Sequence, residues 1–140
     1  MSKLARIRYS ADVIQYISIF ESLTAAKVKD CIVNEQILFI VNENDMGKAI
    51  GKQGSNVKRI ENMMKKKIRL VEFNDNIVQF VQNLIYPIMA KEIKEENGIV
   101  NIYCNDVKSK GMLIGRDRHN INFINNVVKR FFKVEEVKVA

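Results

Sequence analysis

The sequence predicts an α+β fold made of two consecutive units, residues 1–74 and 75–140, each a three-stranded sheet covered by helices. The spacing of apolar residues changes repeatedly along the chain between the period of a helix and that of a strand. The order helix, strand, strand, short helix, turn, helix, strand occurs twice. A chain of 140 residues can form two small domains that each bury a modest core.

The first half begins with a predicted amphipathic helix. Apolar residues from Val13 to Leu23 recur at helical spacing, and Ser10 is expected to cap this helix. The run at 36–41 is apolar throughout, which is typical of a central strand. The other elements expected in this half are strands at 28–33 and 68–73 and helices at 46–50 and 55–64.

The second half repeats this order. Ile77 to Ile85 form an amphipathic helix that Pro87 helps to end. Asn97-Gly98 is a strong signal for a tight hairpin turn. The other elements expected here are strands at 89–96, 99–104 and 134–139 and helices at 108–114 and 119–131.

The two halves also align in sequence, without a gap, around their glycine turns. A shift of 64 residues places Ile50-Gly51 on Ile114-Gly115. The same shift pairs Lys52 with Arg116, Asn56 with Asn120, Val57 with Ile121, Ile60 with Ile124, Asn62 with Asn126 and Lys65 with Lys129. Matches at this density, within matched elements, indicate an internal duplication.

Positive charge is concentrated around both turns. Residues 46–69 hold eight Lys or Arg against one acid, Glu61, so the net charge of this segment is +7. That equals the net charge of the whole chain. Residues 108–133 hold seven bases against one acid, Asp117, a net +6. A chain with this charge and a pI near 9.5 is expected to bind a polyanion, with nucleic acid the first candidate and an anionic membrane surface the second.

Other composition features argue for a cytoplasmic protein without metal. Residues 1–10 do not resemble a signal peptide, and no apolar run approaches the roughly 20 residues that span a bilayer. Cys31 and Cys104 are expected to be buried, reduced thiols, and a single histidine cannot form a zinc cluster. The methionines at 46, 63, 64, 89 and 112 are expected in the core.

The stretch Ile50-Gly51-Lys52-Gln53-Gly54 predicts a short helix that ends at a glycine and turns into a second helix at Ser55. Bare backbone amides beside a lysine, at the start of a helix, suit a phosphate. Such an isoleucine-glycine-x-x-glycine turn between two helices, in this order of elements, resembles a KH domain. The helix and strand that precede the core resemble the type II, or prokaryotic, variant.

Two such units with almost no linker resemble the archaeal form of the NusA family of transcription factors. The similar segments are MGKAIGKQGSNVKRIE, LVEFNDN, GRDRHNINF and KRFFKVEEVKV. Bacterial members carry further polymerase-binding and S1 domains, to which nothing in this sequence corresponds. The resemblance implies capture of nascent single-stranded RNA in transcription termination or antitermination, with RNA polymerase left open as a further partner and no cofactor, membrane or small-molecule substrate.

In a KH domain the turn clamps the backbone of about four unpaired nucleotides. The glycines leave room for phosphate, Lys52 and Gln53 supply charge and hydrogen bonds, and Ile50 and Val57 are expected to pack against a base. The residues expected to bind RNA are Lys48, Ile50, Gly51, Lys52, Gln53, Gly54, Asn56, Val57, Lys58, Ile114, Gly115, Arg116 and Arg118.

The second turn departs from the motif. Gly115-Arg116-Asp117-Arg118 lacks the closing glycine, since Arg118 stands where the backbone should meet phosphate, and Asp117 adds repulsion. We therefore expect this copy to bind more weakly or by a different geometry, with the side chains of Arg116 and Arg118 reaching phosphates.

Three other functions deserve comparison with RNA binding. A nucleotide-hydrolysing phosphate loop is disfavoured because only three residues separate Gly47 from Gly51 and because Gln53 stands where a magnesium-binding Ser or Thr is needed, so no enzyme activity is expected. A DNA-binding helix-turn-helix is disfavoured because the second helix carries the core residues Ile60 and Met64. A KH protein of ribosome assembly or rRNA binding stays open.

Overall fold

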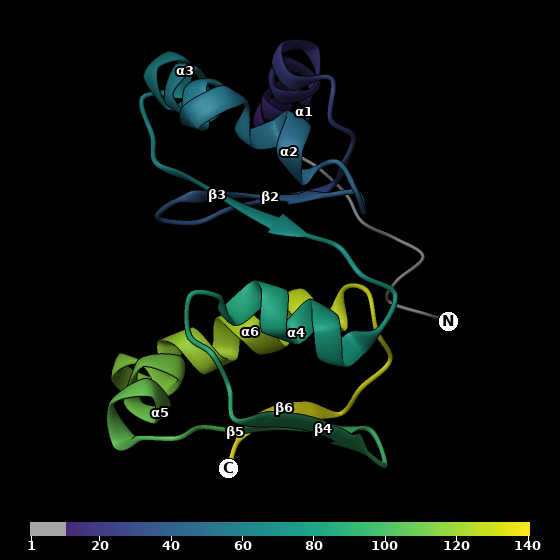
Figure 1. Ribbon diagram of the computed structural model, residues 1–140, viewed down its shortest axis with the longest axis vertical. Helices are drawn as coiled ribbons and strands as arrows, with labels where there is room; N and C mark the ends of the chain where they lie inside the picture. The colour runs from purple at the N-terminus through teal and green to yellow at the C-terminus, as the bar shows by residue number, and fades with distance from the viewer. Residues whose placement is uncertain (1–10) are drawn as a thin grey trace. The chain divides into compact units, whose positions relative to one another are not determined.

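The computed structural model describes residues 11–140, which form two compact units, 11–74 and 75–140. Ser10, the expected helix cap, lies outside the described residues. Each unit contains the same sequence of helices and strands, and each folds around its own sheet (Figure 1).

The first unit is a three-stranded sheet with its helices on one face (Figure 1). The elements of this unit are α1 (Ala11–Thr24), β1 (Val28–Val33), β2 (Ile37–Val41), α2 (Met46–Ile50), α3 (Ser55–Met64) and β3 (Ile68–Glu72). The central strand β2 pairs antiparallel with β1 and parallel with β3.

The core of this unit lies between the sheet and the helices. Phe20 of α1 stacks on Phe39 of β2 with ring centroids 4.3 Å apart, and both side chains are fully buried. Ala49 of α2 and Ile60 of α3 complete the same cluster. Truncating either phenylalanine to Ala would remove packing that is worth about 3–5 kcal/mol in a close-packed core. The helices that flank the glycine turn are therefore fixed on the sheet.

The second unit repeats this topology, with central β5 antiparallel to β4 and parallel to β6. Phe80 of α4 is fully buried, and its ring lies 5.7 Å from that of Phe131 and 5.6 Å from that of Phe132. The elements are α4 (Ile77–Ile85), β4 (Glu92–Glu96), β5 (Ile99–Tyr103), α5 (Val107–Ile114), α6 (His119–Lys129) and β6 (Glu136–Val139).

The α+β prediction is confirmed, and the hairpin at Asn97-Gly98 forms with positive φ at both residues, 53° and 82°. Strand β4 starts later than predicted because the Gln82 side chain holds the preceding loop, donating to the Ile88 carbonyl at 3.0 Å and accepting from the Ala90 amide at 3.3 Å. Strand β6 also starts late, after the Glu135 amide has donated to the Gly98 carbonyl at 2.7 Å.

A polar side chain joins the last helix of each unit to its last strand. Asn125 of α6 is buried, donates to the carbonyls of Ile121 and Val137 at 3.0 and 2.9 Å, and accepts from the Val137 amide at 2.7 Å. The residue 64 positions earlier, Glu61 of α3, accepts from the Ile68 amide at 2.9 Å. The duplication therefore preserves the helix position of this joint, whereas the bonded strand residue and the chemistry differ.

Two expectations about sulfur-containing residues need correction. Cys31 is buried as expected, but Cys104 is only half-buried. Burial raises the pKa of the Cys104 thiol, and the charge of Asp106 raises it further, so the thiol form is favoured. Met46 and Met64 pack against the core, whereas three others are exposed by 52–63%, because they lie on the outer faces of helices or in a loop: Met63, Met89 and Met112.

Candidate nucleic-acid interface

The first glycine turn links α2 to α3. Gly51 ends α2 with φ 76° and ψ 172°, a combination that is essentially restricted to glycine. Gln53 and Gly54 then take left-handed conformations, with φ of 55° and 75°, and α3 begins at Ser55. The Gly54 amide donates to the Gly51 carbonyl at 3.2 Å, which closes the turn.

The two glycines of this turn have different surroundings. A Cβ atom built on Gly51 would lie 2.8 Å from Asn56 Cγ and 2.9 Å from the Asn56 backbone nitrogen. A Cβ atom built on Gly54 would meet nothing within 4 Å. Gly51 is thus required by the interior of the turn, whereas Gly54 borders open space that a phosphate can approach.

Charged, polar and apolar side chains lie on this turn or next to it along the chain. Lys52 and Gln53 are exposed at the turn itself. Ile50 is 40% exposed, and Val57 is half-buried. The Gly54 amide already donates within the turn, so this combination can hold a phosphate through the lysine, close to the bare backbone of Gly54, while a base packs on the apolar side chains.

Two further lysines flank the turn. Lys58 is exposed on α3, and Lys48 is exposed on α2. The Lys48 ammonium lies 3.9 Å from a carboxylate oxygen of Asp45, at a side chain that is 60% exposed. An ion pair this exposed is weak, so Lys48 can still turn toward an anion. Arg69 is half-buried on β3, and burial lowers the pKa of its guanidinium.

The second turn has almost the same backbone as the first. Gly115 has φ 74° and ψ 172°, within two degrees of Gly51. Asp117 and Arg118 take left-handed conformations with φ of 53° and 60°, where the first turn has Gln53 and Gly54. The Arg118 amide donates to the Gly115 carbonyl at 3.2 Å, as Gly54 does to Gly51.

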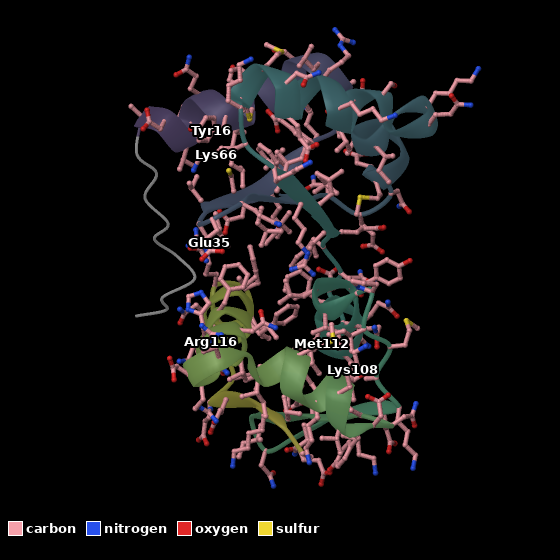
Figure 2. The ribbon with its side chains drawn as sticks, turned by 90° about the vertical axis from the view of Figure 1, so that its left-hand side faces the viewer. Tyr16, Glu35, Lys66, Lys108, Met112 and Arg116 are labelled. Atoms are coloured by element: carbon pink, nitrogen blue, oxygen red, sulfur yellow. The ribbon has the colours of Figure 1, made fainter. Side chains whose placement is uncertain are left out.

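The second turn presents a different surface. Arg116, Asp117 and Arg118 are all exposed in the turn between α5 and α6, where Figure 2 labels Arg116. The apolar positions beside it are more covered than in the first unit, since Ile114 is half-buried and Ile121 is 1% exposed. Charge is therefore retained around this turn, while less apolar surface is available to a base.

Comparison with known proteins adds an independent line of evidence. Residues 14–108 match the family model described as KH domain, a match that includes the whole first turn. A probable transcription termination protein NusA from Methanocaldococcus jannaschii is 30% identical, over 97% of this chain and 76% of the relative. The protein of the same name from Methanococcus vannielii is 34% identical, over 96% and 80%.

The chain belongs to the archaeal-type NusA family of KH-domain proteins. The relative from Halococcus morrhuae, also named probable transcription termination protein NusA, is 30% identical over 96% of this chain and 99% of its own length. The crystal structure of APE1850 is similar with a TM-score of 0.72 and 29% identity, covering 94% of this chain and 100% of that one. The type II KH fold predicted for both units agrees with these similarities.

Within this NusA-family chain, the structure brings the predicted residues together in two groups. Lys48 and Ile50 lie on α2 just before the first glycine turn, and Lys52 to Gly54 form that turn. Val57 and Lys58 lie near the start of α3. Ile114, Gly115, Arg116 and Arg118 form the second group. RNA binding by these residues stays a prediction, and the geometry permits it.

Sequence reasoning missed the internal role of two asparagines. The Asn56 side-chain amide donates to the Lys48 carbonyl at 2.9 Å, and Asn120 donates in the same way to the Met112 carbonyl at 3.0 Å. The sequence alone predicts Asn56 only as one of the residues that bind RNA. No signal in the sequence separates this pair from Asn62 and Asn126, which repeat at the same shift of 64 residues and are exposed.

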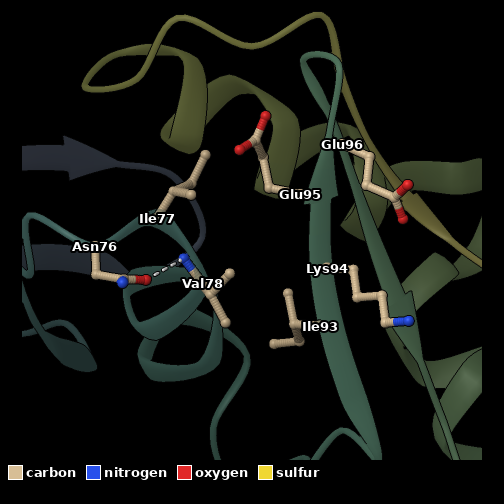
Figure 3. Close-up of a pocket in the computed structure, with 7 residues that line it drawn as sticks. All are labelled: Asn76, Ile77, Val78, Ile93, Lys94, Glu95 and Glu96. Carbon is tan, nitrogen blue, oxygen red and sulfur yellow. Dashed lines mark hydrogen bonds between the residues drawn. The ribbon is translucent and has the colours of Figure 1, made fainter.

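A hollow of about 500 Å³ opens between the start of α4 and β4 in the second unit (Figure 3). Its lining includes the exposed carboxylates of Glu95 and Glu96 together with Lys94, whose ammonium lies 3.7 Å from a carboxylate oxygen of Glu92. The Asn76 side chain accepts from the amides of Val78 and Gln79 at 2.9 and 3.2 Å, so these helix-start donors already have an acceptor. This hollow is unsuited to phosphate, and none of the residues predicted to bind RNA lines it.

Two kinds of feature are absent from the described part of the chain. Residues 11–140 contain no group of three or more His, Cys, Asp or Glu side chains placed to hold a metal ion. No helix within the same residues is both long enough and apolar enough to cross a membrane.

Proposed function

We propose that this protein binds single-stranded RNA with its first glycine turn and acts in the cytoplasm on transcription termination or antitermination by capturing nascent transcripts. The observation that carries the proposal is the open space over Gly54, in a turn that also holds exposed Lys52 and follows partly exposed Ile50. The names of the archaeal relatives supply the transcriptional context, and RNA polymerase is a proposed further partner.

The mechanism is recognition without chemistry. A phosphate pairs with the ammonium of Lys52 and comes close to the backbone at Gly54, where no Cβ atom stands; the Gly54 amide itself already donates to the Gly51 carbonyl. Gln53 hydrogen-bonds to sugar or phosphate. The following base packs against Ile50 and Val57, which removes apolar surface from water. Lys48 and Lys58 attract the strand over a longer range, an effect that salt screens. No cofactor, membrane or small-molecule substrate takes part.

The second turn is proposed to assist by a different contact. Its exposed Arg116 and Arg118 can reach phosphates with their side chains, which compensates for the missing second glycine. Asp117 repels the same phosphates, and Ile121 is covered, so base contacts are weaker here. The first unit therefore supplies most of the base recognition, and the second mainly adds backbone charge.

The first test is fluorescence anisotropy with short single-stranded RNAs across a salt series, on the wild type and on Gly54→Asp. The control is Asn62→Asp, which lowers the net charge by the same amount at an exposed position on α3, the helix that follows Gly54. We expect a log-log salt slope of about −0.7 per neutralised phosphate and affinity at least about tenfold lower for Gly54→Asp. Equal losses in the two variants would mean that the basic surface acts diffusely.

A second experiment decides the cellular role. Co-purification of the intact protein with RNA polymerase would support the transcriptional function. Co-purification with ribosomal particles instead would favour rRNA binding or ribosome assembly, with the same RNA-binding turn put to another use. Preference for duplex DNA over single-stranded RNA in competition would contradict both.

A further inference from the structure

The same hydrogen bond is found in both turns. Asn56 and Asn120 each donate a side-chain amide to the carbonyl eight residues earlier, Lys48 or Met112, at 2.9 and 3.0 Å. In each unit the acceptor belongs to the short helix before the turn, and the donor belongs to the helix after it. The bond thus closes over the turn from one helix to the other.

The acceptors are carbonyls that a helix end leaves without a partner. The Gly47 carbonyl accepts from the Gly51 amide at 3.0 Å, which is the last bond of α2. A continuing helix would give the Lys48 carbonyl the next amide, but the chain turns away at Gly51. Asn56 supplies the donor instead, and Asn120 does the same at the end of α5.

The first glycine provides the space for this side chain. A Cβ atom on Gly51 would lie 2.8 and 2.9 Å from Cγ and Nδ2 of Asn56, and a Cβ atom on Gly115 would lie 2.8 Å from Cβ of Asn120. The second glycine is not needed for the same purpose, because Arg118 occupies its place with φ 60° and ψ 20° where Gly54 has 75° and 17°.

We propose that the pairs Gly51–Asn56 and Gly115–Asn120 fix the shape of the two turns, and that Asn56 is thereby a positioning residue for RNA. This role rests on the RNA binding proposed above, whereas the effect on turn shape does not. The first glycine admits the asparagine, the asparagine holds the turn, and the second position stays free to be glycine or arginine. The duplicated turns keep the part that sets shape and differ in the part that faces the ligand.

The test uses two-dimensional NMR of backbone amides together with RNA anisotropy, on Asn56→Ala and on the control Asn62→Ala, an exposed asparagine of the same helix. We expect Asn56→Ala to shift the amide signals of Gly51 and Gly54 and to weaken RNA binding about tenfold, the effect of one lost hydrogen bond. Asn62→Ala should change neither. If the alanine variant folds poorly, Asn56→Asp takes its place, since it keeps the shape of the side chain and loses the donor. It should shift the same amide signals.

Two comparisons separate a positioning role from a merely structural one. In the Gly54→Asp background, Asn56→Ala should cause no further loss of RNA affinity, because both act through the same turn. Asn120→Ala should shift the amides of Gly115 and Arg118, while its matched control Asn126→Ala should not. Unshifted turn amides in Asn56→Ala would contradict the proposal that Asn56 fixes the shape of the turn. Shifted amides with unchanged RNA affinity would contradict the role of Asn56 in positioning RNA.

Failure of the RNA-binding function is distinguishable from failure of this inference. If the wild type binds no single-stranded RNA, the proposed function is wrong, but the amide shifts of the asparagine variants still decide what holds the turns. If RNA binds and Gly54→Asp abolishes it, the affinity of Asn56→Ala decides the positioning role alone.

Discussion

Gly51 and Gly115 differ by 2° in φ and not at all in ψ, whereas the residues three positions later, Gly54 and Arg118, differ by a complete arginine side chain. The left-handed conformation costs a non-glycine residue about 1–2 kcal/mol, yet Arg118 adopts it. Surrounding structure must therefore impose the shape of the second turn, and a broken glycine motif does not imply a broken turn.

The comparison also separates shape from chemistry. The backbone of the two turns is the same, but Gln53-Gly54 has become Asp117-Arg118, and Ile121 is covered where Val57 is half-exposed. Under the proposed function these outward features matter, because phosphate and base would contact the surface of the turn. The two turns would then contribute different contacts to RNA.

The largest effect that would sharpen the comparison is expected from the first glycines. Gly51→Ala should lower the free energy of unfolding by about 3 kcal/mol, because it combines a strained conformation with a Cβ contact of 2.8 Å. Gly54→Ala faces open space and should cost only about 1 kcal/mol. Urea denaturation measures both, and equal costs would show that the Asn56 contact does not constrain Gly51.

The joint between last helix and last strand is expected to rank second. Asn125→Ala removes three hydrogen bonds from a buried site and should cost about 2–3 kcal/mol. Its exposed neighbour Asn126→Ala is the control and should change the free energy of unfolding by less than about 0.5 kcal/mol. In the first unit, Glu61→Gln keeps an acceptor for the Ile68 amide and should be milder than Asn125→Ala. A cost of Asn125→Ala no larger than that of Asn126→Ala would contradict this assignment.

Arg118→Gly restores the second glycine and should have a smaller effect. Relief of the left-handed strain exceeds the added chain entropy of glycine, so the variant should be more stable by about 0.5 kcal/mol. Its RNA affinity should nevertheless fall, with a shallower salt slope, if the arginine side chain contacts phosphate. An unchanged slope with higher affinity would mean that this turn binds through its backbone, as the first is proposed to do.

The smallest expected effect concerns pH. The Asp106 carboxylate accepts from the Ser109 amide at 2.6 Å at the start of α5, and this bond lowers its pKa. Because the pKa of Asp106 is lower in the folded state, the ionised carboxylate stabilises the folded protein at pH values above the unfolded pKa of about 4. This stabilisation is lost as the pH falls through the pKa of the folded state. Asp106→Ala should therefore lower the denaturation midpoint at neutral pH, and the difference from wild type should shrink in acid. A difference that is constant with pH would exclude this carboxylate as the cause.

Much of the fold followed from local patterns in the sequence. The apolar run at 36–41 predicted the central strand, which is observed at Ile37–Val41, and Asn97-Gly98 predicted the hairpin. The helices on either side of the first turn were predicted at the bounds observed, since the glycine and the following serine mark where one ends and the next begins. The start of β4 was wrong because Gln82, six or more residues away, holds the loop before it.

The sequence by itself determined the duplication, the order of elements, the concentration of positive charge and the position of both turns, because each depends on residues that are near one another along the chain. Only the tertiary structure decided that the two glycines of the first turn face different surroundings, that Arg118 keeps the turn's shape and that Asn56 and Asn120 hold it. These features depend on side chains reaching across a reversal of the chain, and no local periodicity encodes which atoms then meet.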